Sequence, residues 1–188
     1  MKLDVLVFAA HPDDAELACS GTIASLIDEG KKVGIIDLTR GELGSRGTPE
    51  DRFEEAAKSK EILGVQVRDN LDIGDGFFEI NEATILKLVR SIRTYQPEVI
   101  LANALEDRHP DHGRGGALAK RVHFLSGLLK IETEIDGVIQ NPWRAKSLFH
   151  YIQDTYLKPD FVVDITGFWD KKIDSIAAFK SQFKADEG

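Results

Sequence analysis

Apolar residues along this chain gather in short runs that alternate with longer amphipathic stretches. The runs predict strands at residues 3–9, 33–38, 65–71, 98–103, 146–153 and 161–165. The stretches between them predict helices at residues 16–29, 49–63, 82–95, 113–129 and 168–183. Strands separated by helix-length segments are typical of a parallel sheet with right-handed crossovers. We therefore predict an α/β fold, a three-layer Rossmann-like sandwich with a mostly parallel sheet.

Local signals mark the ends of two of these helices. Thr48 followed by Pro49 and two acidic residues is a typical helix start, and Gly64 is a typical stop. Asn81 is placed to cap the next helix, which Pro97 ends. The glycine-punctuated segment 40–47 lies between a strand and a helix, and it is either a surface loop or a lid that faces the substrate.

Polar turns follow the first and the fourth predicted strands. The first turn reads Ala10-His-Pro-Asp-Asp-Ala-Glu16, and the second reads Asp107-Arg-His-Pro-Asp-His-Gly113. Ligands of open α/β sheets bind beyond the carboxyl ends of the strands, so two such turns at one edge could complete one site. Histidine and aspartate together favour a metal ion such as zinc, which usually takes three protein ligands in an enzyme.

Composition narrows the class of protein. The 188 residues are 42% hydrophobic and 30% charged, which is ordinary for one globular domain spanning residues 1–188. A net charge of −8 gives no electrostatic support for nucleic-acid binding. No apolar run approaches the roughly 20 residues that cross a bilayer, so we expect no membrane partner. Cys19 is the only cysteine, which favours a reducing, cytoplasmic location.

Nucleotide-binding fingerprints are absent from the sequence. The first strand–turn–helix lacks the G-x-G-x-x-G pattern, and no G-x-x-x-x-G-K-[ST] occurs. A simpler interpretation of the two polar turns remains beside the metal hypothesis. Asp13 or Asp14 could merely cap the following helix, the histidines could be ordinary loop residues, and Asp111 could be a simple turn residue.

The chemistry that these turns could support needs more than metal ligands. A hydrolase needs a base for the attacking water and a donor for the developing oxyanion. Asp13 is adjacent to a candidate ligand but points elsewhere if Asp14 ligates, so it is a candidate base. One of His109 and His112 can ligate while the other acts on the substrate, and Asp111 could hold an imidazole in one tautomer.

The two turns together resemble the LmbE-like (PIG-L) family of zinc-dependent N-acetylglucosamine deacetylases. Three further stretches fit that resemblance: Leu38-Thr-Arg-Gly-Glu42, Arg52-x-x-Glu-Ala56 and Phe179-Lys-Ser-Gln-Phe183. The sequence is most similar to the bacillithiol-pathway branch, which deacetylates N-acetylglucosaminyl malate. Members of that branch usually continue beyond the last stretch with a tail that adds pocket residues. The single domain, residues 1–188, is therefore expected to be a truncated or a short member.

The resemblance also implies roles for individual residues. It implies zinc ligands at His11, Asp14 and His112, a general base at Asp13, an oxyanion-stabilising imidazolium at His109 and an orienting carboxylate at Asp111. It implies substrate-binding roles for Arg52, Arg108 and Glu42. Glu16 is expected to be a first-turn helix acid that supports the ligands rather than a ligand itself.

Several alternatives remain open at this point. A chitooligosaccharide deacetylase or a thiol-conjugate amidase would use the same scaffold, and Fe²⁺ could occupy a site of two histidines and one carboxylate as well as Zn²⁺. A phosphoesterase is disfavoured because no second carboxylate-rich metal set is evident. An inactive metal-binding or scaffold protein is the non-enzyme alternative. The resemblance further implies a small amino-sugar substrate and a homo-oligomer, a trimer or hexamer.

Overall fold

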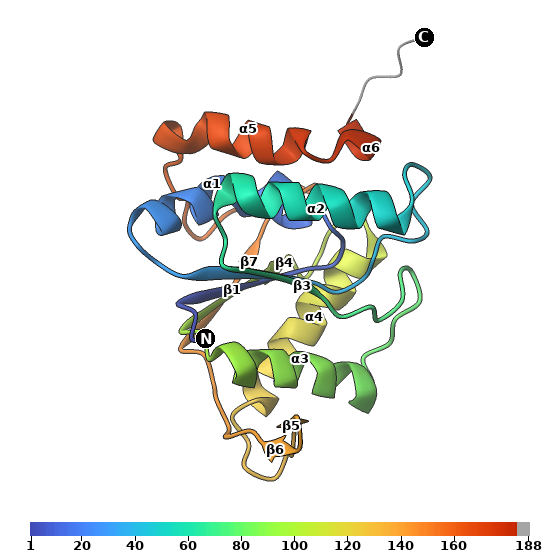
Figure 1. The fold of residues 1–188 in the computed structure, drawn as a ribbon, viewed down its shortest axis with the longest axis vertical. Helices are drawn as coiled ribbons and strands as arrows, with labels where there is room; N and C mark the ends of the chain where they lie inside the picture. Colours follow the sequence, from blue (N-terminus) through green and yellow to red (C-terminus); the bar gives the residue numbers. More distant parts are fainter. Residues whose placement is uncertain (184–188) are drawn as a thin grey trace.

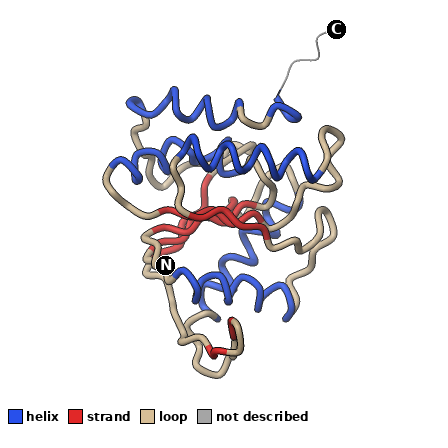
Figure 2. Tube along the Cα trace, in the orientation of Figure 1, coloured by secondary structure: helices blue, strands red, loops and turns tan. Residues whose placement is uncertain are grey.

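A five-stranded parallel sheet forms the centre of the computed structural model, which describes residues 1–183 (Figures 1 and 2). The strands lie in the order β3-β2-β1-β4-β7, and every neighbouring pair is parallel. Their bounds are β1 Val5–Ala9, β2 Val33–Asp37, β3 Val67–Asn70, β4 Val99–Asn103 and β7 Ser147–Tyr151. The predicted α/β sandwich is thereby confirmed.

Helices cover both faces of this sheet (Figure 1). One face carries α1 (Asp14–Asp28) and α2 (Pro49–Leu63), and the other carries α3 (Glu82–Tyr95) and α4 (Pro110–Leu125). Both faces of the central strands are apolar because both are buried, and β1 is buried at every position. A two-stranded hairpin, β5 (Glu134–Ile135) and β6 (Val138–Ile139), lies beyond α3.

The predicted helix ends around α2 and α3 are formed. Thr48 and Asp51 make a reciprocal capping box at the start of α2, and Gly64 ends the helix with a left-handed φ of 81°. Asn81 and Thr84 make the same kind of box at the start of α3. These two helices therefore begin and end where their local sequence directs.

Strands β1 and β4 are adjacent in the sheet, and successive strands are added outward from this pair in opposite directions, β2 and β3 on one side and β7 on the other. Val5 pairs with Val99 and Val7 with Leu101, so the ends of these strands lie side by side at one edge. Helix α4 packs close to β4 because Gly116 has no side chain, and a Cβ there would lie 2.6 Å from the Asn103 carbonyl oxygen. The turns that follow β1 and β4 thus meet at the switch point where α/β folds bind their ligands.

Three predicted elements differ from the structure. Helix α4 begins at Pro110 rather than at 113, because proline suits the first helical position and His109 serves as the cap. The predicted strand at 161–165 is wrong: Val162 is 81% exposed, and no strand among residues 1–183 pairs with this segment. The segment does not continue the sheet beside β7 but crosses toward α1, where the Ile165 side chain packs over Gly21.

The single helix predicted at 168–183 is also wrong, because the segment is interrupted. It contains η1 (Thr166–Phe168), α5 (Trp169–Ala177) and α6 (Lys180–Phe183), and it lies on the outer side of α1 and α2 (Figure 1). The fully buried Phe179 sits at the break between α5 and α6, so tertiary packing of this ring outweighs helix continuity there.

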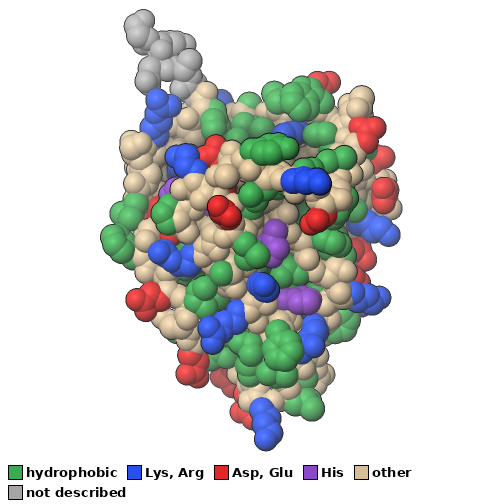
Figure 3. Space-filling model, turned by 180° about the vertical axis from the view of Figure 1, so that it is seen from behind, with side chains coloured by type: hydrophobic (Ala, Val, Ile, Leu, Met, Phe, Trp, Pro, Cys, Tyr) green, Lys and Arg blue, Asp and Glu red, His purple; other side chains and the backbone are tan. Residues whose placement is uncertain are grey.

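Charged side chains of both signs lie on the surface of the protein (Figure 3). On the face seen in Figure 3, basic and acidic side chains are interspersed, and histidine side chains reach the surface among them. Within the described residues, no helix combines the length and the apolar character needed to cross a bilayer.

Candidate metal centre

The three side chains that the sequence nominates as metal ligands lie together at the switch point. Asp14 Oδ2 is 3.6 Å from His11 Nδ1, and Asp14 Oδ1 is 3.1 Å from His112 Nε2. The side chains of His11, Asp14 and His112 are only 10%, 2% and 6% exposed, respectively. Each imidazole thus lies beside a different oxygen of Asp14, and together the three side chains offer the two-histidine, one-carboxylate donor set that zinc takes.

Asp14 is held in this position by three hydrogen-bond donors. The backbone N–H of His11 and the side-chain amide of Asn103 donate to Oδ2 at 3.0 and 3.1 Å, and the Gln153 amide donates to Oδ1 at 2.8 Å. Neither Asp13 nor Asp14 caps α1 through its side chain, so the simpler capping interpretation is excluded for both. Gln153 Oε1 is buried and has no hydrogen-bond partner among the described residues. It therefore offers a hydrogen-bond acceptor near Asp14 to a small bound molecule.

The carboxylates around His11 also favour a bound cation. Burial disfavours a charged imidazole, yet hydrogen bonding to the Asp111, Asp14 and Asp75 carboxylates raises the pKa of His11 to about 12. The protein alone thus retains a proton to balance this negative charge. A divalent ion would supply the same positive charge and displace the proton, as metal binding to histidine sites does.

Asp13 is buried beside the donor set without contributing to it. Its backbone φ of 126° is rare for any residue other than glycine, and backbone strain of this kind is concentrated at functional sites. Burial and the neighbouring Asp14 carboxylate raise the pKa of Asp13 from 3.8 to about 8, although Arg52 opposes the shift. A carboxylate with a pKa near neutrality can accept a proton from water and return it.

His109 lies 4.6 Å from His11, ring centre to ring centre, and is partly exposed. The backbone N–H of Asp111 donates to His109 Nδ1 at 3.2 Å, so this nitrogen carries a lone pair and the proton of the neutral ring is on Nε2. His109 belongs to a group of three histidines whose nitrogens lie within 4.8 Å of one another. A neutral ring that accepts at Nδ1 has no second lone pair for a metal, so His109 is better suited to donate a hydrogen bond.

The expected pairing of Asp111 with His109 is not formed. The Asp111 carboxylate instead accepts from the Gly76 backbone N–H and the Arg114 guanidinium, both at 2.7 Å, and approaches His11 Nε2 at 3.6 Å. Burial and the neighbouring His11 and His112 also lower the pKa of His109, which disfavours the imidazolium that the sequence suggested. Asp111 therefore orders the loop around Gly76 instead of pairing with His109.

The three candidate substrate-binding residues occupy different environments. Glu42 uses both carboxylate oxygens on the backbone N–H groups of Asp75 and Arg40, at 2.9 and 3.1 Å. Arg52 is buried under the glycine loop and donates to Gln182 of α6, whereas Arg108 is exposed and paired with Asp154. Glu42 thus orders its own loop, and the substrate contacts of all three residues stay predictions.

Below the donor set lies a buried ion cluster that joins α1 to the sheet. Glu16 is fully buried and accepts from Ser59 and Arg68, and Arg68 also donates to Asp37 at 2.9 and 3.0 Å. Through these contacts Glu16 ties the first turn of α1 to α2 and β3. Removing one member of such a buried pair would leave an unpaired charge, so the cluster fixes the position of the helix that carries Asp14.

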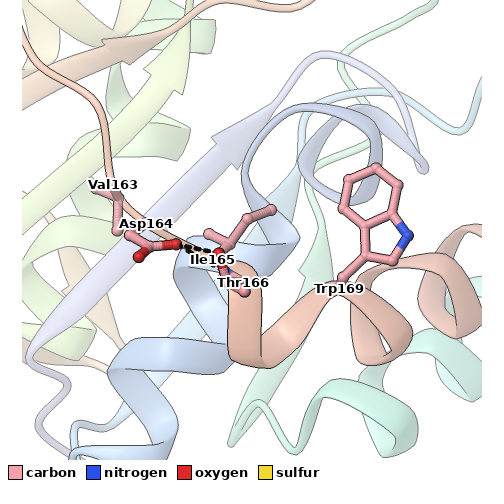
Figure 4. Close-up of a pocket in the computed structure, with 5 residues that line it drawn as sticks. All are labelled: Val163, Asp164, Ile165, Thr166 and Trp169. Carbon is pink, nitrogen blue, oxygen red and sulfur yellow. Dashed lines mark hydrogen bonds between the residues drawn. The ribbon is translucent and has the colours of Figure 1, made fainter.

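A separate cavity lies away from this centre. Val163, Asp164, Ile165, Thr166 and Trp169 surround about 540 Å³. Figure 4 shows the Asp164 carboxylate accepting a hydrogen bond from Thr166, with the indole of Trp169 on the other side of Thr166. Its lining contains one acidic side chain and no histidine, so it offers no comparable donor set.

Comparisons with known proteins place this geometry in context. The model of the PIG-L family, described as GlcNAc-PI de-N-acetylase, matches residues 6–123, which contain both polar turns. The crystal structure of the conserved protein TT1542 from Thermus thermophilus has 42% identity and a TM-score of 0.89, covering 96% of this chain and 80% of that one. The diacetylchitobiose deacetylase of Thermococcus kodakarensis is 30% identical over 97% of this chain and 71% of its own length.

Two more distant relatives have names that point to different substrates. A protein of Bacillus cereus named "Probable N-acetyl-alpha-D-glucosaminyl L-malate deacetylase 2" is 26% identical over 98% of this chain and 86% of its own length. The 4-oxalmesaconate hydratase of Pseudomonas putida is 27% identical over 94% of this chain and 73% of its own length. Relatives on this scaffold therefore include both deacetylases and a hydratase.

Proposed function

The chain belongs to the PIG-L family, and we propose that it is a zinc-dependent enzyme that hydrolyses the acetamide of an N-acetylglucosamine derivative. The observation that carries the proposal is the pair of groups flanking the donor set. Asp13 is a buried carboxylate with a raised pKa, and His109 is a neutral imidazole with its proton on Nε2. Hydrolysis of an amide requires both a base and an oxyanion donor.

The protein residues would act as follows. His11, Asp14 and His112 would hold the ion. Bound Zn²⁺ would polarise the amide carbonyl and acidify water at the site. Asp13 takes a proton from the attacking water as the water oxygen forms a bond to the carbonyl carbon. The carbonyl oxygen gains negative charge, and His109 donates Nε2–H to it. Asp13 then returns the proton to the nitrogen as the carbon–nitrogen bond breaks, which releases acetate and the free amine.

The substrate that we place first is N-acetylglucosaminyl malate, the bacillithiol precursor. The sequence resemblance and the name of the Bacillus cereus relative support this choice. Diacetylchitobiose is the second candidate, because the Thermococcus kodakarensis relative has the higher identity. A homo-oligomer and a cytoplasmic location remain predictions from the sequence.

Acetate release from a substrate panel tests the proposal. The zinc-loaded protein would be assayed with N-acetylglucosaminyl malate, diacetylchitobiose and free N-acetylglucosamine, with the chelator-treated protein as the control. We expect acetate only from the metal-loaded protein, and the highest kcat/KM for the malate conjugate. Absence of acetate from all three substrates would overturn the proposal, and a preference for diacetylchitobiose would replace the substrate.

The pH dependence of kcat/KM follows from Asp13. Only the deprotonated carboxylate accepts a proton, so activity is expected to fall as the pH drops through the pKa of Asp13. That pKa is raised to about 8 in the protein without metal, and a nearby cation would lower it. We therefore expect an acid limb between the ordinary carboxyl value of 3.8 and about 8. A kcat/KM profile that stays flat down to pH 4 would remove Asp13 as the base.

A further inference from the structure

Each imidazole of the donor set meets a second carboxylate at its other ring nitrogen. His112 Nδ1 lies 2.7 Å from Asp107 Oδ2, and His11 Nε2 lies 3.1 Å from Asp75 Oδ1. Asp107 opens the second polar turn, whereas Asp75 lies outside both turns and has no motif around it. Asp75 is 64 residues from His11 and comes from the loop between β3 and α3.

Both carboxylates are themselves fixed by backbone N–H groups. Asp107 Oδ1 accepts from the Arg108 and Thr155 amides at 2.8 and 2.7 Å, and Asp75 Oδ2 accepts from the Leu43 amide at 2.9 Å. The side chains of Asp107 and Asp75 are only 1% and 7% exposed, respectively. One oxygen of each carboxylate is thus anchored, and the other is aimed at an imidazole.

We propose that Asp107 and Asp75 are positioning residues that fix the tautomers of the two imidazole ligands. A neutral imidazole has one N–H and one lone pair, so a carboxylate that accepts the N–H directs the lone pair to the opposite nitrogen. Asp107 thereby directs His112 Nε2 toward Asp14 Oδ1, and Asp75 directs His11 Nδ1 toward Asp14 Oδ2. The inference rests on the proposed function only in that the donor set binds a metal.

Asp107 gives the cleaner test, because its carboxylate contacts one imidazole while His11 also approaches Asp111. Asparagine at position 107 has one acceptor oxygen for three surrounding donors. With the oxygen toward the Arg108 and Thr155 amides, its NH₂ faces His112 Nδ1 and favours the tautomer that blocks Nε2. With the oxygen toward His112, the NH₂ faces two backbone N–H groups. Either arrangement disfavours the His112 tautomer that keeps a lone pair on Nε2 for the metal. Losses of about 10- to 100-fold in metal affinity are typical when such a partner of a ligand is changed.

The experiment measures the zinc dissociation constant by competition with a chromophoric chelator. We expect Asp107→Asn to raise it by about 10- to 100-fold, whereas the control Asp154→Asn leaves it unchanged. Asp154 is a close neighbour, is 43% exposed and pairs with Arg108 rather than with an imidazole. In the zinc-loaded wild type, NMR should show an exchange-protected Nδ1–H on His112 that is lost or shifted in Asp107→Asn but not in Asp154→Asn.

Unchanged zinc affinity and an unchanged His112 signal in Asp107→Asn would overturn the inference. If this variant does not fold without metal, Asp75→Asn provides the equivalent test on His11, and failure of both to fold would show that the carboxylates support the fold rather than the tautomers. The proposed function fails separately, since a wild type that binds zinc but releases no acetate would leave the positioning role intact.

Discussion

Replacing Asp13 with asparagine is expected to lower kcat by on the order of 10²-fold or more while the protein keeps its metal. Asp13 is buried next to the donor set, but the oxygens that face both imidazoles belong to Asp14. Asparagine preserves the shape of the side chain and tolerates the positive φ of this position better than most residues. The substitution therefore removes the proton acceptor with little other change.

The matched comparison for Asp13→Asn is His112→Ala, which removes a ligand. That variant should lose both zinc and activity, whereas Asp13→Asn should lose activity alone. Zinc content of the purified proteins and kcat on the best substrate of the panel separate the two. An Asp13→Asn protein that emerges without zinc would require the roles of Asp13 and Asp14 to be exchanged.

The sequence could predict the meeting of the two turns because local patterns and simple topology were sufficient. Short apolar runs alternating with helices imply a parallel sheet, and the turns after two neighbouring strands then share an edge. The capping signals at Thr48 and Asn81 are local as well, and both are realised. Every residue nominated as a ligand lies within one of two short motifs, so no long-range contact had to be guessed.

The surroundings of the donor set could not be predicted in the same way. Asp75 and Gln153 reach it from separate loops, and isolated polar residues in loops carry no periodic signal. Asn103 is the exception, because a polar residue at the end of a strand beside the second turn could have been flagged. The resemblance pairs Asp111 with His109, but His109 is the extended N-cap residue of α4, and the backbone N–H of Asp111 rather than its carboxylate meets the imidazole. The carboxylate consequently points toward Gly76 and Arg114.

Substitution of His109 is expected to reduce kcat by about 10²- to 10³-fold, as losing one oxyanion donor typically does. The oxyanion donor that is lost is the Nε2–H of the neutral ring. Nδ1 cannot be that donor because it accepts the Asp111 backbone N–H. His109 also caps α4 through that same bond, so an alanine variant would lose a helix cap worth about 1 kcal/mol in addition to the donor.

A pair of variants separates these two roles of His109. Asparagine is a favourable N-cap residue but lacks the reach of the imidazole Nε2–H, so His109→Asn should lose turnover while keeping the unfolding temperature. His109→Ala should lose a similar amount of turnover and also unfold at a lower temperature. Both variants should keep the wild-type zinc affinity, because a ring that accepts at Nδ1 and is protonated at Nε2 does not ligate. A zinc dissociation constant that rises in both variants as steeply as kcat falls would instead place His109 among the ligands, in the group it forms with His11 and His112.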